Sequence, residues 1–294
     1  MKNIVCFGEV LWDVFPTHKK IGGAPLNVAL RLKSLDNNVS IISRTGDDKK
    51  GQKIKKHLLK QGVNVANLQI DSQLKTGKVK VMLNAKGSAS YDIMFPRAWD
   101  KITLTDTSKS ITQHADAFIY GSLVARDDIS RASLYALLKL AKYKIFDINL
   151  RAPYYTKEVL NYLMNEADFI KFNDEEIFEI GEALHSQTHS LEQNITFLAE
   201  QTNTKTICVT KGRHGAILYY NGTFYYNSGY QIEVVDTVGA GDSFLATLIS
   251  KLLKGDNPQE AIDYACAIGA LVAGSEGANP QFSAEDIHAF INPN

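Results

Sequence analysis

The feature that most constrains the fold of this chain is a regular alternation of short apolar runs with segments of helical period. Runs such as IVCFGEV, AFIYGS, KIFDIN and TICVTK are separated by segments whose apolar residues recur three or four apart, for example residues 25–35 and 130–141. Apolar runs of this length are typical of strands buried on both faces, and helices between them connect parallel strands. The pattern predicts an α/β fold with a mostly parallel central sheet flanked by helices on both faces.

One region breaks this alternation and predicts an inserted β-sheet. Between residues 68 and 95 apolar positions recur every second residue, with Val79 and Val81 on one side of a strand and Ile93 on one side of the next. Residues 84–88 favour a turn that makes this pair antiparallel. We predict a core formed by residues 1–12, 22–66 and 100–294, and a small β-sheet lid formed by residues 13–21 and 67–99. Ligands of α/β folds lie beyond the carboxyl ends of the strands, where such an insertion can close over them.

Charge and cysteine use exclude several classes of function. The 32 Lys and Arg residues balance the 32 Asp and Glu residues, so no net field attracts nucleic acid or an anionic membrane. The three cysteines lie far apart and show no zinc-binding spacing, which is typical of buried thiols in a reducing compartment. No apolar run approaches the roughly 20 residues of a membrane span, and the N-terminal run reads as a first strand. We expect a cytoplasmic protein with small-molecule partners.

The stretch VVDTVGAGDSF, residues 234–244, combines the two conditions for an anion site. Its small residues allow close approach of backbone N–H groups, and the helix that starts here presents unpaired N–H groups and a positive dipole end. An acid beside a bound phosphate, Asp242, has a use if it takes a proton from the hydroxyl that attacks phosphorus. The alternative is an acid that only stabilises the first turn of a helix. No GxGxxG or GxxxxGK[ST] motif occurs, which excludes the common dinucleotide and Walker A loops.

This stretch resembles the second signature, D-T-x-G-A-G-D-x-F, of the ribokinase (PfkB-type) carbohydrate kinases. Residues 22–29, GGAPLNVA, resemble the first signature in a form common in fructokinase-like members, although Asp36 stands where Gly or Ser is usual. Asp13, the NDEE of residues 173–176, and VTKG at 209–212 with Gly215 are similar to further motifs. The resemblance runs from about residue 4 to about residue 290. It implies a ribokinase-like α/β fold, a β lid and an ATP-dependent kinase.

The resemblance also implies the catalytic and metal-binding roles. Asp242 is expected to be the general base, and the amides of Gly239, Ala240 and Gly241 to bind the charge on the transferring phosphoryl group. Mg²⁺ is expected to accompany ATP and to contact Glu176 through water. Asp236 and Val238 are weaker candidates for a monovalent site for an ion such as K⁺. From the residues alone, Asn173 and Glu176 also suit a helix cap with first-turn acids.

The remaining expected contacts divide between the sugar and the nucleotide. A neutral sugar needs hydrogen-bond partners, and an acid can accept bonds from two hydroxyls. Residues expected on the sugar side are Asp13, Gly23, Asn27, Phe95, Arg97 and Arg151. Residues expected on the nucleotide side are Asn173, Glu176, Thr210, Lys211, Gly212, Gly215 and Asn279.

The function expected from this resemblance is ATP-dependent phosphorylation of a sugar, with fructose as the first choice. A 2-keto-3-deoxygluconate kinase is the alternative, because Arg97 or Arg151 suits a substrate carboxylate. Ribokinase and nucleoside kinase activities are further alternatives. A sugar or nucleotide sensor without catalysis is the alternative from another class, although a sensor has no need of a base. An exposed edge of the lid sheet favours pairing with a second copy, so we expect a homodimer through the lid.

Overall fold

A nine-stranded sheet forms the centre of the computed structural model, which describes residues 1–83 and 89–293. The strand order is β13-β12-β11-β10-β9-β8-β1-β4-β5, and the pairs from β10–β11 through β4–β5 are parallel. Only β12 and β13 join antiparallel. The strands are β1 (Asn3–Phe7), β4 (Asn38–Gly46), β5 (Asn64–Asp71), β8 (Ala117–Gly121), β9 (Lys144–Asp147), β10 (Phe169–Asn173), β11 (Thr206–Thr210), β12 (Ala216–Tyr220) and β13 (Thr223–Asn227). This arrangement confirms the predicted mostly parallel α/β sheet.

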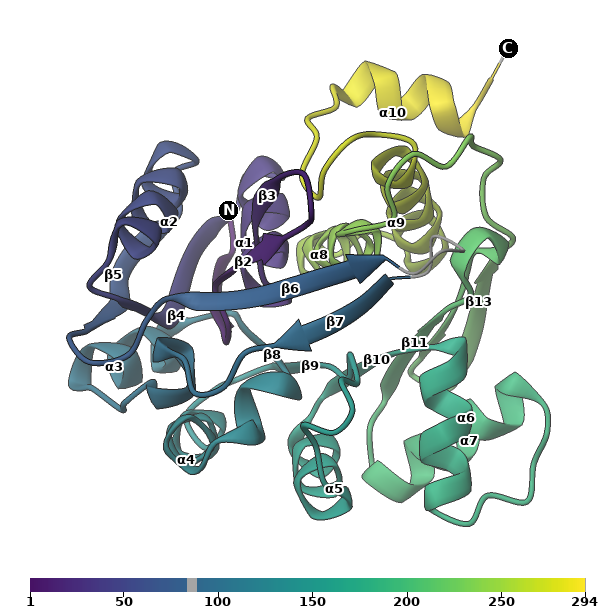
Figure 1. Ribbon diagram of the computed structural model, residues 1–294. Coiled ribbons are helices and arrows are strands. Elements are labelled where there is room, and N and C mark those ends of the chain that lie inside the picture. Colours follow the sequence, from purple (N-terminus) through teal and green to yellow (C-terminus); the bar gives the residue numbers. More distant parts are fainter. Residues whose placement is uncertain (84–88, 294) are drawn as a thin grey trace.

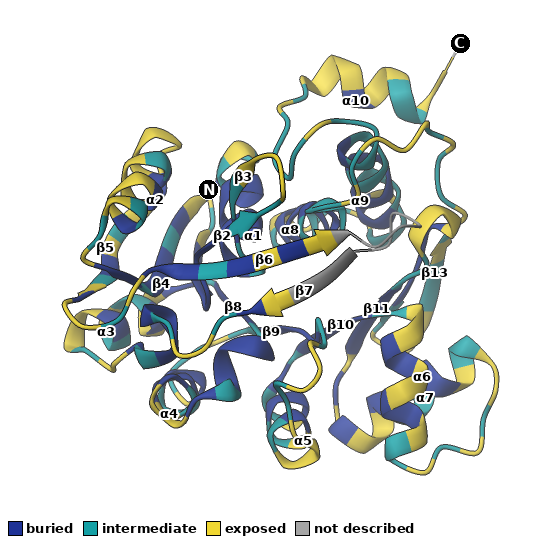
Figure 2. Ribbon diagram, viewed as in Figure 1, coloured by how far each residue is buried: buried dark blue, intermediate teal, exposed yellow. Residues whose placement is uncertain are grey.

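Helices cover both faces of this sheet (Figure 1). One apolar cluster joins the sheet to α4 (Asp128–Leu138), α5 (Lys157–Glu166), α6 (Asp174–Ala183) and α7 (Leu191–Thr202). A second cluster joins the other face to α1 (Ala24–Ser34), α2 (Lys49–Lys60), α8 (Ala240–Lys254) and α9 (Pro258–Ala273). The remaining helices are α3 (Asp106–His114), α10 (Ala284–Ile291) and the short 3₁₀ turns η1 (Ala98–Lys101), η2 (Leu123–Arg126) and η3 (Gly212–His214). Figure 2 shows the central strands as mostly buried, as their apolar runs predict.

A second, four-stranded sheet forms the lid, with the order β3-β2-β6-β7. Its strands are β2 (Leu11–Val14), β3 (Lys19–Gly22), β6 (Gly77–Leu83) and β7 (Ala89–Ile93), and Figure 1 shows β6 and β7 as a long hairpin in front of the large sheet. β6 and β7 pair antiparallel, with Val79 opposite Ile93. Val79, Val81 and Ile93 are all buried in the apolar cluster that continues into the core, so the period-two pattern identified the buried face of the lid.

The predicted boundary between core and lid is wrong at two places. Residues 67–71, expected in the lid, belong to β5 and pair with β4 in the large sheet. The lid also takes in Leu11, Trp12 and Gly22, because β2 and β3 begin and end beyond residues 13–21. Sequence pattern could not separate β5 from the lid, because this edge strand mixes exposed and buried residues and lacks the continuous apolar run of the central strands. The turn expected at residues 84–88 lies outside the described residues.

Asp36, where the related signature usually has a small residue, has φ +59°, a left-handed conformation that glycine adopts freely and aspartate tolerates. Within residues 1–83 and 89–293, none of the helices has the length and apolar character that crossing a membrane requires.

Candidate active site

The start of α8 forms the centre of the candidate site. Gly239 has φ +80° and precedes the helix, and a Cβ atom there would overlap Ala278. Only glycine therefore fits this turn without a shift of the backbone. The Ala240 N–H already donates to the Thr237 carbonyl at 3.3 Å, so it is not free as the sequence analysis expected. Part of the expected anion hole is thus engaged within the turn, which leaves Gly239 and Gly241 as the stronger candidates.

Asp242 lies in the first turn of α8 and faces α1. Its Oδ2 accepts a 2.8 Å hydrogen bond from Asn27 Nδ2, across 215 residues of sequence. Burial and the charge of Asp147 raise the pKa of Asp242 to about 6, against the opposing effects of Asn27, Lys171 and Arg151. At neutral pH this carboxylate is mostly ionised and still close enough to its pKa to accept a proton efficiently.

Asn27 connects Asp242 to the segment that follows α9. Its Oδ1 accepts a 3.3 Å hydrogen bond from Asn279 Nδ2 while its own Nδ2 donates to Asp242. Asn279 was expected on the nucleotide side, but here it contacts this sugar-side residue and does not line the large cavity described below. Asn279 therefore contacts Asn27, and its expected place on the nucleotide side stays a prediction.

The lid and the N-terminus of α1 bring further polar groups to the same end of the site. Burial raises the pKa of Asp13 to about 6, opposed by the charges of Arg151 and Lys20. A Cβ atom at Gly22 would overlap the Asp13 carboxylate, and one at Gly23, which has φ +112°, would lie 2.5 Å from the Glu9 carbonyl oxygen. These two glycines therefore let Asp13 and the start of α1 approach each other closely.

Glu9 is a buried acid that the sequence analysis did not assign. Burial raises the pKa of its carboxyl to about 7, and the charge of Asp242 adds to the rise while Arg151 opposes it. Within residues 1–83 and 89–293, its Oε2 has no hydrogen-bond partner. The charge of Arg151 lowers the pKa of all three acids, Glu9, Asp13 and Asp242.

Lys171 is a second residue that the sequence analysis missed. It lies on β10, is buried, and donates a 2.9 Å hydrogen bond to Asp147 Oδ1. Burial would lower its pKa, but the charges of Asp147 and Glu176 raise the pKa above the usual value. A Cβ atom at Gly241 would lie 3.8 Å from Lys171 Nζ, so this ammonium neighbours the glycine loop. A lysine within the apolar strand FIKFN was the available signal, because lysine is rarely buried unless it is paired.

Asn173 and Glu176 form the cap of α6. The Glu176 N–H donates to Asn173 Oδ1 at 2.7 Å, and Glu176 Oε2 accepts from the Asn173 N–H at 2.8 Å. Glu176 Oε1 accepts a third bond, from the Leu150 N–H at 2.9 Å. Burial raises the pKa of Glu176, and Lys171 opposes that rise. Each carboxylate oxygen retains acceptor capacity for a water, so the residue fits Mg²⁺ held through water. The capping interpretation is confirmed.

A large cavity lies on the other side of the glycine loop, with a volume of about 1110 Å³. Ala240 and Gly241 line its end nearest α8, and Thr210, Gly212 and Gly215 line it from β11 and η3. Lys211, expected here, does not line it. Residues that the sequence analysis did not name include Tyr230, Glu233, Phe244, Cys266, Ala270 and Ala273. The cavity is large enough for a nucleotide and is mostly apolar, as ligand pockets usually are.

Asp236 is already paired with a cation from the lid. Lys20 Nζ contacts Asp236 Oδ2 at 2.8 Å, and the Val238 N–H donates to Asp236 Oδ1 at 3.0 Å. Although burial opposes it, these interactions hold the pKa of Asp236 below its usual value. Within the described residues, His, Cys, Asp and Glu side chains do not gather in threes at a metal-binding geometry. Mg²⁺ bound mainly to phosphates and water needs no such group.

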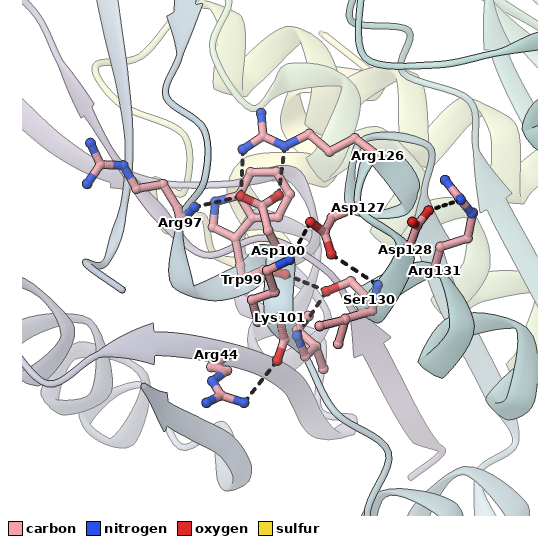
Figure 3. Close-up of polar contacts among 12 residues, drawn as sticks. Arg44, Arg97, Trp99, Asp100, Lys101, Arg126, Asp127, Asp128, Ser130 and Arg131 are labelled. Carbon is pink, nitrogen blue, oxygen red and sulfur yellow. Dashed lines mark hydrogen bonds and ion pairs between the residues drawn. The ribbon is translucent and has the colours of Figure 1, made fainter. Parts of the chain in front are cut away.

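Phe95 and Arg97 follow β7 directly. Phe95 is 56% exposed and so does not continue the buried face of the strand. The Arg97 N–H donates to Asp100 Oδ2 at 2.7 Å, and its Nη2 lies 3.0 Å from Met94 Sδ. Figure 3 shows the Arg97 side chain directed away from Asp100, so its backbone N–H contacts Asp100 while its guanidinium contacts Met94.

Comparison with known proteins decides the family. The model of the pfkB family carbohydrate kinases matches residues 1–285. This chain belongs to that family. Fructokinase-2 of Solanum lycopersicum is 28% identical over 312 residues, which cover 94% of this chain and 92% of the relative.

Two solved structures are similar to this pfkB kinase over most of its length. The fructokinase of Vibrio cholerae O395, in its fructose, ADP and calcium ion bound form, has 25% identity and a TM-score of 0.84, with 99% of each chain covered. A sugar kinase of Pyrococcus horikoshii in complex with ATP has 27% identity and a TM-score of 0.82, covering 94% of this chain and 93% of that one. The pfkB kinase therefore has the ribokinase-like fold that the sequence predicted.

Proposed function

We propose that this pfkB kinase transfers the γ-phosphoryl group of ATP to a hydroxyl of fructose. One observation carries the proposal: the glycine loop at the start of α8 lines a nucleotide-sized cavity, while Asp242, in the same turn, accepts a hydrogen bond from Asn27 of α1. The fructose and ADP bound by the similar Vibrio cholerae enzyme, and the ATP bound by the Pyrococcus horikoshii enzyme, support these substrates.

The residues of this chain have separate tasks in the proposed reaction. Asp13 and Asn27 bind sugar hydroxyls, and Asp242 accepts the proton of the attacking hydroxyl. The free N–H groups of the loop and the positive end of α8 stabilise negative charge on the transferring group. Lys171, next to Gly241, adds a positive charge at the same place. When bound, Mg²⁺ neutralises phosphate charge, and Glu176 and Asn173 would hold it through water.

The sugar panel is the decisive test of this function. ADP release from Mg-ATP is measured with fructose, 2-keto-3-deoxygluconate, ribose, glucose and adenosine. We expect the highest kcat/KM with fructose, because the site offers hydrogen-bonding groups for a neutral sugar. A preference for 2-keto-3-deoxygluconate would replace fructose with the acid sugar and assign its carboxylate to Arg151 or Arg97. Calorimetric binding of sugar and ATP analogue without any ADP release would contradict the kinase and indicate a sensor.

We also propose that two copies associate through their lids in a reducing compartment. β3 and β7 are the edge strands of the lid sheet, and open edges favour pairing. The three cysteines are free and buried, which suits a compartment without disulfides. Size-exclusion chromatography with light scattering at micromolar concentration is expected to give twice the chain mass of 32.6 kDa. A monomer under these conditions would contradict the dimer and leave the kinase unaffected.

A further inference from the structure

An arginine that no motif identifies joins three separate elements beside the lid. Arg126 ends η2, after β8, and its side chain is only 2% exposed. Its Nε and Nη2 bond to the two carboxylate oxygens of Asp100 at 2.7 and 2.9 Å, and Asp100 is fully buried. Figure 3 shows this two-pronged contact, with the Arg126 guanidinium above the Asp100 carboxylate. An arginine that makes two parallel hydrogen bonds to one carboxylate is held in a single orientation. A lysine cannot make the same two-pronged contact.

The same guanidinium also fixes the end of β7. Arg126 Nη2 donates to the Met94 carbonyl at 2.9 Å, and Nη1 approaches the Ile93 carbonyl at 3.5 Å. Asp100, its ion-pair partner, accepts from the Arg97 N–H. We call residues 93–100 the lid hinge, because they run from β7 of the lid to η1 of the core. One end of the lid hinge therefore bonds to Arg126 directly, and Asp100 at the other end pairs with the same side chain.

The third element is the loop after β9, which carries Arg151. Tyr154 Oη donates to the Ile93 carbonyl at 2.9 Å, so the loop and Arg126 share an acceptor in the hinge. The Tyr154 N–H donates to the Arg151 carbonyl at 2.8 Å, so the contact with the lid hinge and Arg151 belong to one short turn of this loop. Arg126 also lies over the rings of Tyr154, Phe95 and Trp99, at 4.8, 5.0 and 4.0 Å from their centres.

We propose that Arg126 is a positioning residue that holds the lid hinge against the Arg151 loop and thereby sets how the lid closes over the sugar. The inference rests on the proposed function and adds a determinant of sugar binding outside the family motifs. Arg126 itself does not contact the reacting groups. It acts through Phe95, Arg97 and Arg151, the three sugar-side residues carried by the elements it joins.

The test compares wild type with the double variant Arg126→Gln/Asp100→Asn. The pair is removed together because one buried charge left alone would destabilise the fold. We expect a cooperatively folded protein whose sugar KM rises at least about tenfold and whose kcat/KM for the sugar falls by up to about 100-fold. The KM for ATP should change less than about twofold, because the nucleotide cavity has no contact with this cluster. The ratio of sugar-independent to sugar-dependent ADP release should rise, since a loose lid admits water.

Two further variants make the result specific. Arg126→Lys keeps the charge and loses the two-pronged contact, so its sugar KM should lie between those of wild type and the double variant. Lys109→Gln, which removes the exposed pair with Asp106 on α3, is the matched control and should behave as wild type. If the double variant does not fold, the sugar KM of Arg126→Lys decides.

The outcomes separate this inference from the proposed function. If a folded double variant has the sugar KM of wild type and the same ratio of sugar-independent to sugar-dependent ADP release, that result overturns the role of Arg126 and leaves the kinase intact. An equal loss of affinity for sugar and ATP would also overturn it, since that indicates general damage. If wild type shows no sugar-dependent ADP release, the proposed function fails and this inference fails with it.

Discussion

Replacing Asp242 with asparagine is expected to lower kcat about 10²–10⁴-fold, the usual contribution of a general base. Asparagine is close in size and can still bond to Asn27 after rotation of its amide, so the fold and the KM for ATP should stay near wild type. Steady-state ADP release with fructose and Mg-ATP measures the effect. Because the sugar contacts at Asp13 are untouched, the loss should appear in kcat more than in the sugar KM.

The pH profile provides the control for this interpretation. A base must be ionised to accept a proton, and the pKa of Asp242 is raised to about 6. Wild-type kcat/KM should therefore fall as the pH drops below about 6, and the residual activity of Asp242→Asn should lack that acid limb. An unchanged acid limb alone would assign that limb to the sugar ligand Asp13, whose pKa is also raised to about 6. A variant with nearly wild-type kcat would show that another group takes the proton. Glu9, whose pKa is raised to about 7, would then be tested first.

Replacing Lys171 with methionine is expected to lower the free energy of unfolding by about 3–5 kcal/mol, the cost of breaking a buried ion pair. Methionine keeps the length of the side chain, but Asp147 and Glu176 would remain buried without the nearby cation. Urea unfolding followed by circular dichroism measures the change. Kinase activity should fall as well, because the ammonium also lies beside the glycine loop.

The double variant Lys171→Met/Asp147→Asn separates these two effects. Because both charges of the ion pair are removed, neither is left buried without a partner, and most of the lost free energy of unfolding should return. Activity should not return if Lys171 stabilises charge on the phosphoryl group. Recovery of both would contradict a catalytic contribution and leave Lys171 with a structural task only. A single variant as stable as wild type would contradict the buried pair itself.

Much of the candidate site could be located from local patterns. The strand GAILYY, the small residues before Asp242 and the apolar helices predicted the sheet and the start of α8, because these depend on period and on backbone freedom. The cap of α6 was also predictable, since Asn173 and Glu176 contact each other within one turn. Glycine at position 239 was foreseeable for the same local reason.

Other features could not be predicted because they join distant segments. No pattern near Arg126 indicates Asp100, Met94 and Tyr154 as its neighbours. The backbone at Asp36, where the family signature usually has a small residue, is left-handed, and the sequence did not predict that conformation. The amide of Ala240 looked available from its position, yet a bond to Thr237 within the turn engages it. Lys20 reaches Asp236 across 216 residues, from a lid whose orientation the sequence does not specify.

By itself the sequence determined the α/β architecture, the inserted lid, the family and the glycine loop with Asp242. Each of these depends on the order and spacing of residues close together in the chain. Tertiary structure decided which side chains share a charge environment. It raised the pKa of Asp242 to about 6 through burial and Asp147, placed Lys171 beside the loop, and joined the lid hinge to the core through Arg126. Charge and hydrogen bonding act over a few ångströms in space, and only the folded chain brings those groups within that range.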